Sequence, residues 1–167
     1  MGYGLIQSKD NKIEVIECDI LKINSIKDAY IKLKTIYEFV IQLIDKHHPD
    51  ELSIESPFFG KNVQSMLKLG RAQGVAIAAG LSRELPIFEY SPKKIKQSIT
   101  GNGNASKEQV AGVLGKILFY DFSDNLLDAT DAIATAVCHS FQNKSLISDS
   151  KCKNWSTFIS QNPDRLI

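Results

Sequence analysis

The sequence predicts an α/β fold, and three observations lead to that prediction. Two runs of β-branched and apolar residues, 3–7 and 13–20, are separated by the polar segment 8–12, which is typical of a β-hairpin. Further apolar runs at 52–54 and 86–90 have the length of short strands. They alternate with segments whose apolar residues recur at helical spacing. This order of strands and helices is typical of an α/β domain.

The expected helices are placed by the residues at their ends. Ser25 and Asp28 have the spacing of a capping box, and Pro49 is expected to end the helix that follows them. Asn62 is expected to cap a second helix that reaches about Glu84.

The later helices are predicted in the same way. A short helix is expected to begin at Pro92, and the Gly-Asn-Gly-Asn segment 101–104 is expected to be a loop. Ser106 and Gln109 match a capping box for the next helix. The last helix is expected to fade near Gln142.

Length and composition favour one cytoplasmic domain. The chain has 167 residues, 43% of them hydrophobic, and no apolar run approaches the roughly 18 residues that span a membrane. The start has none of the features of a signal peptide. The histidines at 47, 48 and 139 have no spacing typical of a triad or metal site. The three cysteines are widely spaced, which favours a reducing compartment and argues against zinc: Cys18, Cys138 and Cys152.

The net charge of +1 conceals a pattern along the chain. Residues 61–119 carry a net charge of +6, whereas residues 1–60 carry −3, residues 120–150 carry −4 and residues 151–167 carry +2. A basic middle segment is consistent with a phosphate-binding face beside a metal site. Ordinary surface charge is the alternative explanation, and the numbers alone do not decide between them.

Three acids have settings that indicate a metal site. Glu55 ends the apolar run 51–55, and an acid that closes a buried strand is costly unless a cation compensates it. Asp128 and Asp131 lie three residues apart at the start of a helical segment. Oxygen ligands of this kind suit Mg²⁺. Taken singly, each acid has a simpler explanation as a solvated strand end or a partner of the helix dipole.

Lysines and phenylalanines near these acids are candidates for contacts with nucleic acid. Lys96 and Lys107 flank the glycine-rich loop, where a lysine would stabilise charge on a reacting phosphate. Phe58 and Phe59 follow Glu55 and are candidates to stack on bases. The alternatives are solvated lysines and buried core phenylalanines.

A stripe of small residues lies on the expected second helix. Gly70, Gly74 and Ala78 are spaced four apart, so they share one helix face and permit close approach by a neighbour. The neighbour is either this protein's own sheet or the same helix of a second copy in a dimer.

A family resemblance extends in order from residue 2 to residue 142. The matching segments are Gly2-Tyr-Gly4, Ile54-Glu55 with Phe58, Lys61-Asn62, Leu67 to Ala76, Leu85 to Tyr90, Lys96-Gln97, Gly101 to Gly103, Lys107 and Asp128 to Ala132. On these segments the chain resembles the RuvC family of Holliday junction resolvases.

The resemblance implies a fold, an activity and partners. It implies an RNase H-like domain, a mixed sheet flanked by helices, over residues 1–142, followed by a polar tail over residues 143–167. The implied activity is paired nicking of four-way DNA junctions in recombination and repair, with two Mg²⁺ ions per site and Mn²⁺ as an alternative. The implied partners are junction DNA, a second copy of the chain and proteins of the branch-migration complex.

The resemblance also assigns roles to residues. Glu55, Asp128 and Asp131 match three of the family's four metal-ligand positions, and Lys107 matches a basic residue that is important for cleavage. Two further matches are DNA-binding positions: the basic residue Lys96 and the aromatic Phe58.

The start of the chain departs from the family pattern. Family members carry an apolar strand ending in an Ile-Asp-Pro-Gly type motif before the Gly-Tyr-Gly, and its aspartate is the first metal ligand. Here Met1 directly precedes Gly2-Tyr-Gly4, so this central strand is expected to be missing. The departure leaves a catalytically impaired junction-binding protein as an alternative function. Another RNase H-like nuclease or a transposase is a third reading, which the continuous match disfavours.

Overall fold

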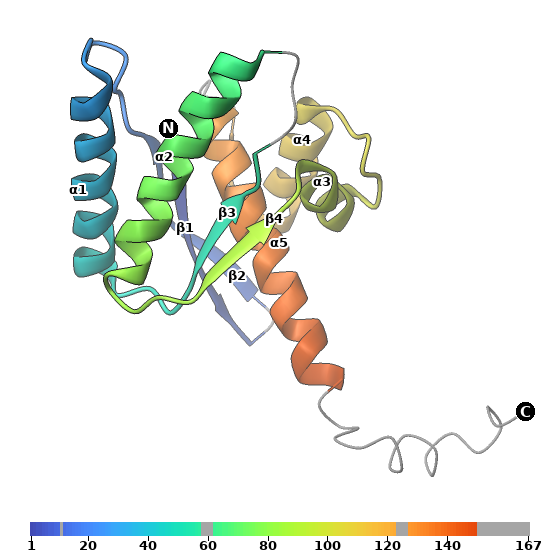
Figure 1. Ribbon diagram of the computed structural model, residues 1–167. Coiled ribbons are helices and arrows are strands. Elements are labelled where there is room, and N and C mark those ends of the chain that lie inside the picture. The colour runs from blue at the N-terminus through green and yellow to red at the C-terminus, as the bar shows by residue number, and fades with distance from the viewer. Residues whose placement is uncertain (11, 58–61, 123–126, 150–167) are drawn as a thin grey trace, which may run out of the picture.

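The chain folds into alternating strands and helices, as the sequence predicts (Figure 1). The computed structural model describes residues 1–10, 12–57, 62–122 and 127–149, with the backbone alone for 143–149. The strands are β1 (Gly2–Lys9), β2 (Lys12–Ile20), β3 (Leu52–Glu55) and β4 (Ile87–Tyr90). The helices are α1 (Ala29–His47), α2 (Val63–Leu81), α3 (Pro92–Thr100), α4 (Lys107–Leu118) and α5 (Leu127–Asp149).

The four strands form two small sheets. β1 and β2 make the predicted antiparallel hairpin, and β3 pairs with β4 in parallel so that Glu55 lies opposite Tyr90. Within the described residues no strand pairs β1 with β3, so the expected mixed sheet is present as two separate two-stranded sheets. The parallel pair needs a crossover connection, which α2 provides.

Helices cover the strands on two sides, and each side has its own apolar core (Figure 1). On one side α1 packs against α2, and Ile36, Val40, Ile44, Ala79 and Leu85 are buried. On the other side α5 contacts β1, β2 and β3, and α3 and α4 pack beside it. The core of this side contains Ile95, Ile99, Val110, Leu114, Leu118, Ile133, Ala134, Val137 and Cys138.

Two glycines allow β1 to lie directly on α5. A Cβ atom added to Gly2 would lie 2.0 Å from the carbonyl oxygen of Asp128, and one added to Gly4 would lie 2.5 Å from Cδ1 of Ile133. At Gly2 the obstacle is backbone, so close approach requires glycine there, whereas a side chain at Gly4 would have to displace Ile133. The start of α5, and with it Asp128, is therefore held against the first strand.

Glu17 joins the hairpin to α1. Its carboxylate accepts hydrogen bonds from Lys46 Nζ at 2.6 Å and from the Tyr3 hydroxyl at 2.8 Å, and His47 Nε2 lies 2.9 Å away. The bond from Lys46, followed by that from Tyr3, lowers the pKa of Glu17 to about 2. Burial, together with the bond to Glu17, raises the pKa of Tyr3 to about 12.

Most of the predicted caps are confirmed. Asn62 accepts a hydrogen bond from the Ser65 backbone at the start of α2. Ser106 and Gln109 form a complete capping box at the start of α4. These contacts satisfy backbone N–H groups that have no partner within the helix.

Three predicted helix boundaries are wrong. Asp28, not Ser25, caps α1, because its carboxylate accepts from the backbone N–H groups two and three residues later, at 2.7 and 3.0 Å. The second helix ends at Leu81, three residues before Glu84. The last helix continues past Gln142 to Asp149, since residues 143–149 contain no glycine or proline to stop it. No helix in the described part of the chain is long and apolar enough to cross a lipid bilayer.

Candidate active site

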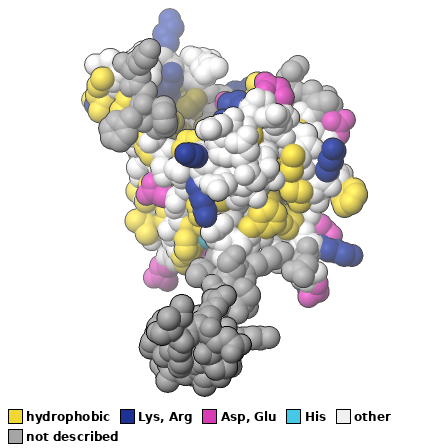
Figure 2. All heavy atoms as spheres, turned by 90° about the vertical axis from the view of Figure 1, so that its right-hand side faces the viewer, with side chains coloured by type: hydrophobic (Ala, Val, Ile, Leu, Met, Phe, Trp, Pro, Cys, Tyr) yellow, Lys and Arg dark blue, Asp and Glu magenta, His cyan; other side chains and the backbone are white. Residues whose placement is uncertain are grey.

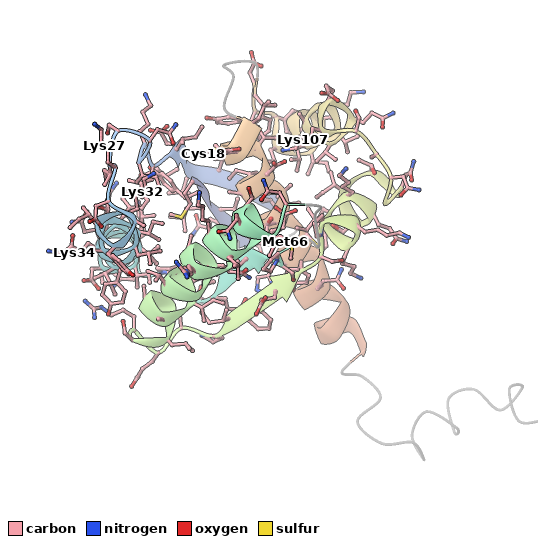
Figure 3. The ribbon with its side chains drawn as sticks, turned by 45° about the horizontal axis from the view of Figure 1, so that its top comes forward. Cys18, Lys27, Lys32, Lys34, Met66 and Lys107 are labelled. Atoms are coloured by element: carbon pink, nitrogen blue, oxygen red, sulfur yellow. The ribbon has the colours of Figure 1, made fainter. Side chains whose placement is uncertain are left out.

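Three elements meet at the end of β3. β3 ends at Glu55, α4 begins at Lys107, and the first turns of α5 carry Asp128 and Asp131. Figure 3 shows Lys107 beside the start of α5. The chain positions these four residues from segments far apart in the sequence.

Lys107 and Asp131 form the central contact of this site. Lys107 Nζ donates to Asp131 Oδ2 at 2.5 Å, and about half of the lysine side chain, 52%, is exposed. This hydrogen bond raises the pKa of Lys107, and the charges of Asp128 and Glu55 raise it further. The negative charges of all three predicted acids therefore interact with the same lysine.

Glu55 is held in a setting that disfavours its charge. Glu55 as a whole residue is exposed to solvent. Neighbouring atoms nevertheless exclude part of the water around its carboxylate, and this desolvation raises the pKa of Glu55. Repulsion from Asp131 raises the pKa further, while Lys107 and Lys96 act in the opposite direction. A cation near Glu55 and Asp131 would relieve this repulsion.

Asp128 lies in the first turn of α5, where an acid is favourable to the helix dipole. It is exposed, and its backbone carbonyl lies against Gly2. Its charge acts on Lys107. The helix dipole and the lysine are thus two separate reasons for an acid at this position.

The donor types at this site suit a hard divalent cation, because all three acids offer carboxylate oxygens. Over the residues that the structure describes, no three acid, histidine or cysteine side chains are grouped so that they could hold a metal ion. One of the carboxylates, Asp131, is instead bound by Lys107. The carboxylates thus match such a cation in donor type, and a cation would relieve the repulsion between Glu55 and Asp131, but the described side chains do not form a ready-made three-ligand site.

The other predicted site residues have different outcomes. Lys96, on α3, is close enough for its charge to lower the pKa of Glu55. Phe58 and Phe59 lie outside the described residues. Figure 2 shows the face on the right of Figure 1, where lysines and arginines are spread among acidic and hydrophobic side chains.

A buried histidine was not selected from the sequence. His139, on α5, is 8% exposed. Its Nδ1 lies 2.7 Å from the Tyr90 hydroxyl and its Nε2 lies 2.7 Å from Glu51 Oε2. The ring also contacts Phe88 with centroids 4.4 Å apart. Its spacing of eight residues from Asp131, which places both on one helix face, is a signal that was available in the sequence.

Carboxylates gathered with lysines at a strand end are typical of proteins that catalyse phosphoryl transfer. The family model described as crossover junction endodeoxyribonuclease RuvC matches residues 1–139. A crossover junction endodeoxyribonuclease RuvC of Cytophaga hutchinsonii is 57% identical over 166 residues, which are 99% of this chain and 82% of the relative. One of Christiangramia forsetii is 55% identical, over 99% of this chain and 86% of that protein.

A solved structure shows the same fold. T. thermophilus RuvC in complex with Holliday junction substrate matches with a TM-score of 0.77 and 22% identity, covering 86% of this chain and 88% of that chain. The chain thus has the RNase H-like fold of a DNA-cutting nuclease. It belongs to the RuvC family of crossover junction endodeoxyribonucleases.

Proposed function

We propose that this chain resolves four-way DNA junctions by hydrolysing phosphodiester bonds at the site formed by Glu55, Asp128, Asp131 and Lys107. The observation that carries the proposal is the 2.5 Å hydrogen bond from Lys107 to Asp131, with Asp128 three residues earlier on α5 and Glu55 near enough for its charge to act on the lysine. Family membership supplies the substrate class.

Each residue has a proposed part in the reaction. Glu55, Asp131 and Asp128 would hold Mg²⁺ or Mn²⁺ through their carboxylate oxygens. When bound, such an ion lowers the pKa of water and stabilises a leaving oxygen. Lys107 neutralises Asp131 in the free protein and, on α4, is placed to donate to a phosphate oxygen that arrives beside that carboxylate. Lys96 adds a second positive charge that acts on Glu55.

We also propose that two copies of the chain associate through α2. Gly70 and Gly74 face open space, because an added Cβ would meet no described atom within 4 Å apart from its chain neighbours and the backbone of its own helix, whereas Gly80 packs on Leu52 and Ile87 of the sheet. Exposed apolar residues extend this face of α2, namely Val63, Leu67 and Leu81. A helix face with open glycines and exposed leucines favours the dimer contact over packing on the chain's own sheet.

The sheet edges support a proposal about the domain. In the described residues β1 pairs with β2 alone and β3 with β4 alone, although both sheets contact α5. A strand paired with β1 and β3 would satisfy their backbone groups and join the sheets. If such a strand ends in the family's aspartate, it brings a fourth acid to the site.

We propose that residues 1–142 form the nuclease domain.

The test is cleavage of a synthetic four-way junction with Mg²⁺. Glu55→Gln and Asp131→Asn each keep the shape of the side chain and remove its charge, so each is expected to abolish cleavage while the junction is still bound. Glu14→Gln, on the exposed side of β2, is the matched control and is expected to cleave normally. Full cleavage by Asp131→Asn would overturn the proposed site.

A second candidate is junction binding with impaired cleavage. It is favoured by the finding that no ready-made group of three metal ligands is present among the described residues. The same assay separates the two functions, because this candidate predicts a bound but uncut junction for the unaltered chain. A chain that carries an N-terminal strand ending in Ile-Asp-Pro-Gly is then expected to show Mg²⁺-dependent nicking.

A further inference from the structure

His139 connects α5 to both strands of the parallel sheet. Its Nε2 contacts Glu51, which immediately precedes β3, and its Nδ1 contacts Tyr90, the last residue of β4. Because Nε2 faces a carboxylate, it carries a proton and donates to Glu51. When the ring is neutral, Nδ1 then accepts from the Tyr90 hydroxyl. The protonation state of each ring nitrogen thus follows from its partner.

The helix α5 and the strand β3 each set how far the His139–Glu51 contact lies from the proposed site. Asp131, Thr135 and His139 are four residues apart on one face of α5, and Thr135 donates to the Asp131 carbonyl at 2.9 Å. Eight residues of α-helix, from Asp131 to His139, span about 12 Å. Four residues of strand, from Glu51 to Glu55, span about 13 Å.

These two lengths nearly match. The pair His139–Glu51 therefore lies at one end of the segment where α5 runs along β3, and the pair Asp131–Glu55 lies at the other end. At one end His139 is hydrogen-bonded to Glu51, and at the other Asp131 lies near enough to Glu55 for their charges to interact. Tyr90 adds a third point of attachment, because it lies opposite Glu55 in the sheet. If α5 slid along β3, the first pair would break and the second would change its separation.

We infer that His139 is a positioning residue that sets where Asp131 lies relative to Glu55, by fixing the register of α5 along β3 through Glu51 and Tyr90. The inference rests on the proposed site. His139 does not touch the reacting groups. It acts through the helix, as residues behind metal ligands do when they orient them.

The test compares His139→Leu with the unaltered chain in three measurements. Leucine keeps apolar bulk against Phe88 and removes both hydrogen bonds. Mn²⁺ binding to the free protein, followed by electron paramagnetic resonance, is expected to weaken by about 10-fold or more. Single-turnover cleavage is expected to fall by about 10²-fold. Junction affinity without metal is expected to stay the same, because no DNA contact is removed.

Two further variants separate positioning from stability. Val137→Ala leaves a cavity in the same buried part of α5 but keeps both hydrogen bonds, so it is expected to lower the Tm without changing Mn²⁺ affinity. His139→Gln retains one donor and one acceptor and is expected to recover most of the Mn²⁺ affinity.

The outcomes distinguish this inference from the proposed site. If Asp131→Asn loses Mn²⁺ binding while His139→Leu behaves like Val137→Ala, the positioning role is overturned and the site stands. If Asp131→Asn binds Mn²⁺ as tightly as the unaltered chain, the site itself is overturned, and the role of His139 falls with it.

Discussion

Lys107 and a divalent cation would compete for the same carboxylate. In the free protein the ammonium group of Lys107 is 2.5 Å from Asp131 and compensates its charge. Under the proposed function, removing that lysine has two opposite effects: the metal loses a competitor for Asp131, and the phosphate loses a hydrogen-bond donor.

Lys107→Met is expected to separate these effects. The stem is kept and the charge is lost, so Mn²⁺ affinity of the free protein should rise, while single-turnover junction cleavage should fall by roughly 10²-fold. Calorimetry and a quenched-flow cleavage assay measure the two quantities. Lys116→Met, in the last turn of the same helix, is the control and should change neither. Weaker Mn²⁺ binding by Lys107→Met would show that the lysine supports the metal instead of competing with it.

Glu17 gives a prediction about pH. Its folded-state pKa of about 2 lies below the ordinary value of 4.5, so the ionised carboxylate stabilises the fold above pH 4.5. That contribution is lost as the pH falls from 4.5 towards 2. Glu17→Gln should therefore be less stable than the unaltered chain in urea at pH 7, and the difference should shrink steadily below pH 4.5. The exposed Glu14→Gln on the same strand is the control, and a difference that persisted undiminished at pH 2.5 would contradict the assignment.

At the scale of elements, local sequence signals predicted most helix starts. The Ser106–Gln109 box and the Asn62 cap are contacts within four residues, so the residue types alone indicate them. The start of α1 was misplaced because Ser25 and Asp28 have the right spacing, yet Asp28 itself is the acceptor. The spacing of two polar residues does not show which of them is the N-cap of the helix.

The capping box of α4 also has a consequence for the site, since Lys107 is the first residue of that helix. Ser106→Ala should cost about 1 kcal/mol of stability and loosen the first turn. Cleavage should fall more than the loss of folded protein explains. Asp28→Ala removes the cap of α1, far from Lys107, and should cost similar stability without that extra loss. Equal cleavage by the two variants, measured where both are fully folded, would argue against a link between this cap and the site.

At the scale of the whole molecule, the sequence correctly predicts the class of fold, and the predicted site residues stay a prediction. The sequence does not predict the pairing of Lys107 with Asp131, which are 24 residues apart, or the His139–Glu51 contact, which spans 88. Such contacts depend on how helices lie on strands, and residue spacing does not encode that. The division into two sheets is likewise a property of strand pairing across the chain.

The proposed dimer face can be tested without harming the monomer. Gly74 faces open space, and glutamate is a better helix former than glycine, so Gly74→Glu should leave each copy as stable or slightly more stable. The new charges would repel each other across a two-fold contact, so light scattering should show a shift from dimer to monomer. Gln42→Glu, on the exposed side of α1, is the matched control. A dimer that persists in Gly74→Glu would place the contact elsewhere.

Gly2 and Gly4 differ from Gly112 in the substitutions that the fold can accept, and the sequence alone does not show this difference. At Gly2 and Gly4 every replacement adds an atom where α5 already lies, within 2.0 and 2.5 Å. A saturation library selected for folded protein should therefore be nearly empty at Gly2 and depleted at Gly4, although neither is fully buried. At Gly112, which meets nothing within 4 Å, the same library should accept many residues. Tolerance in the first strand is thus set by a helix that follows it by more than a hundred residues.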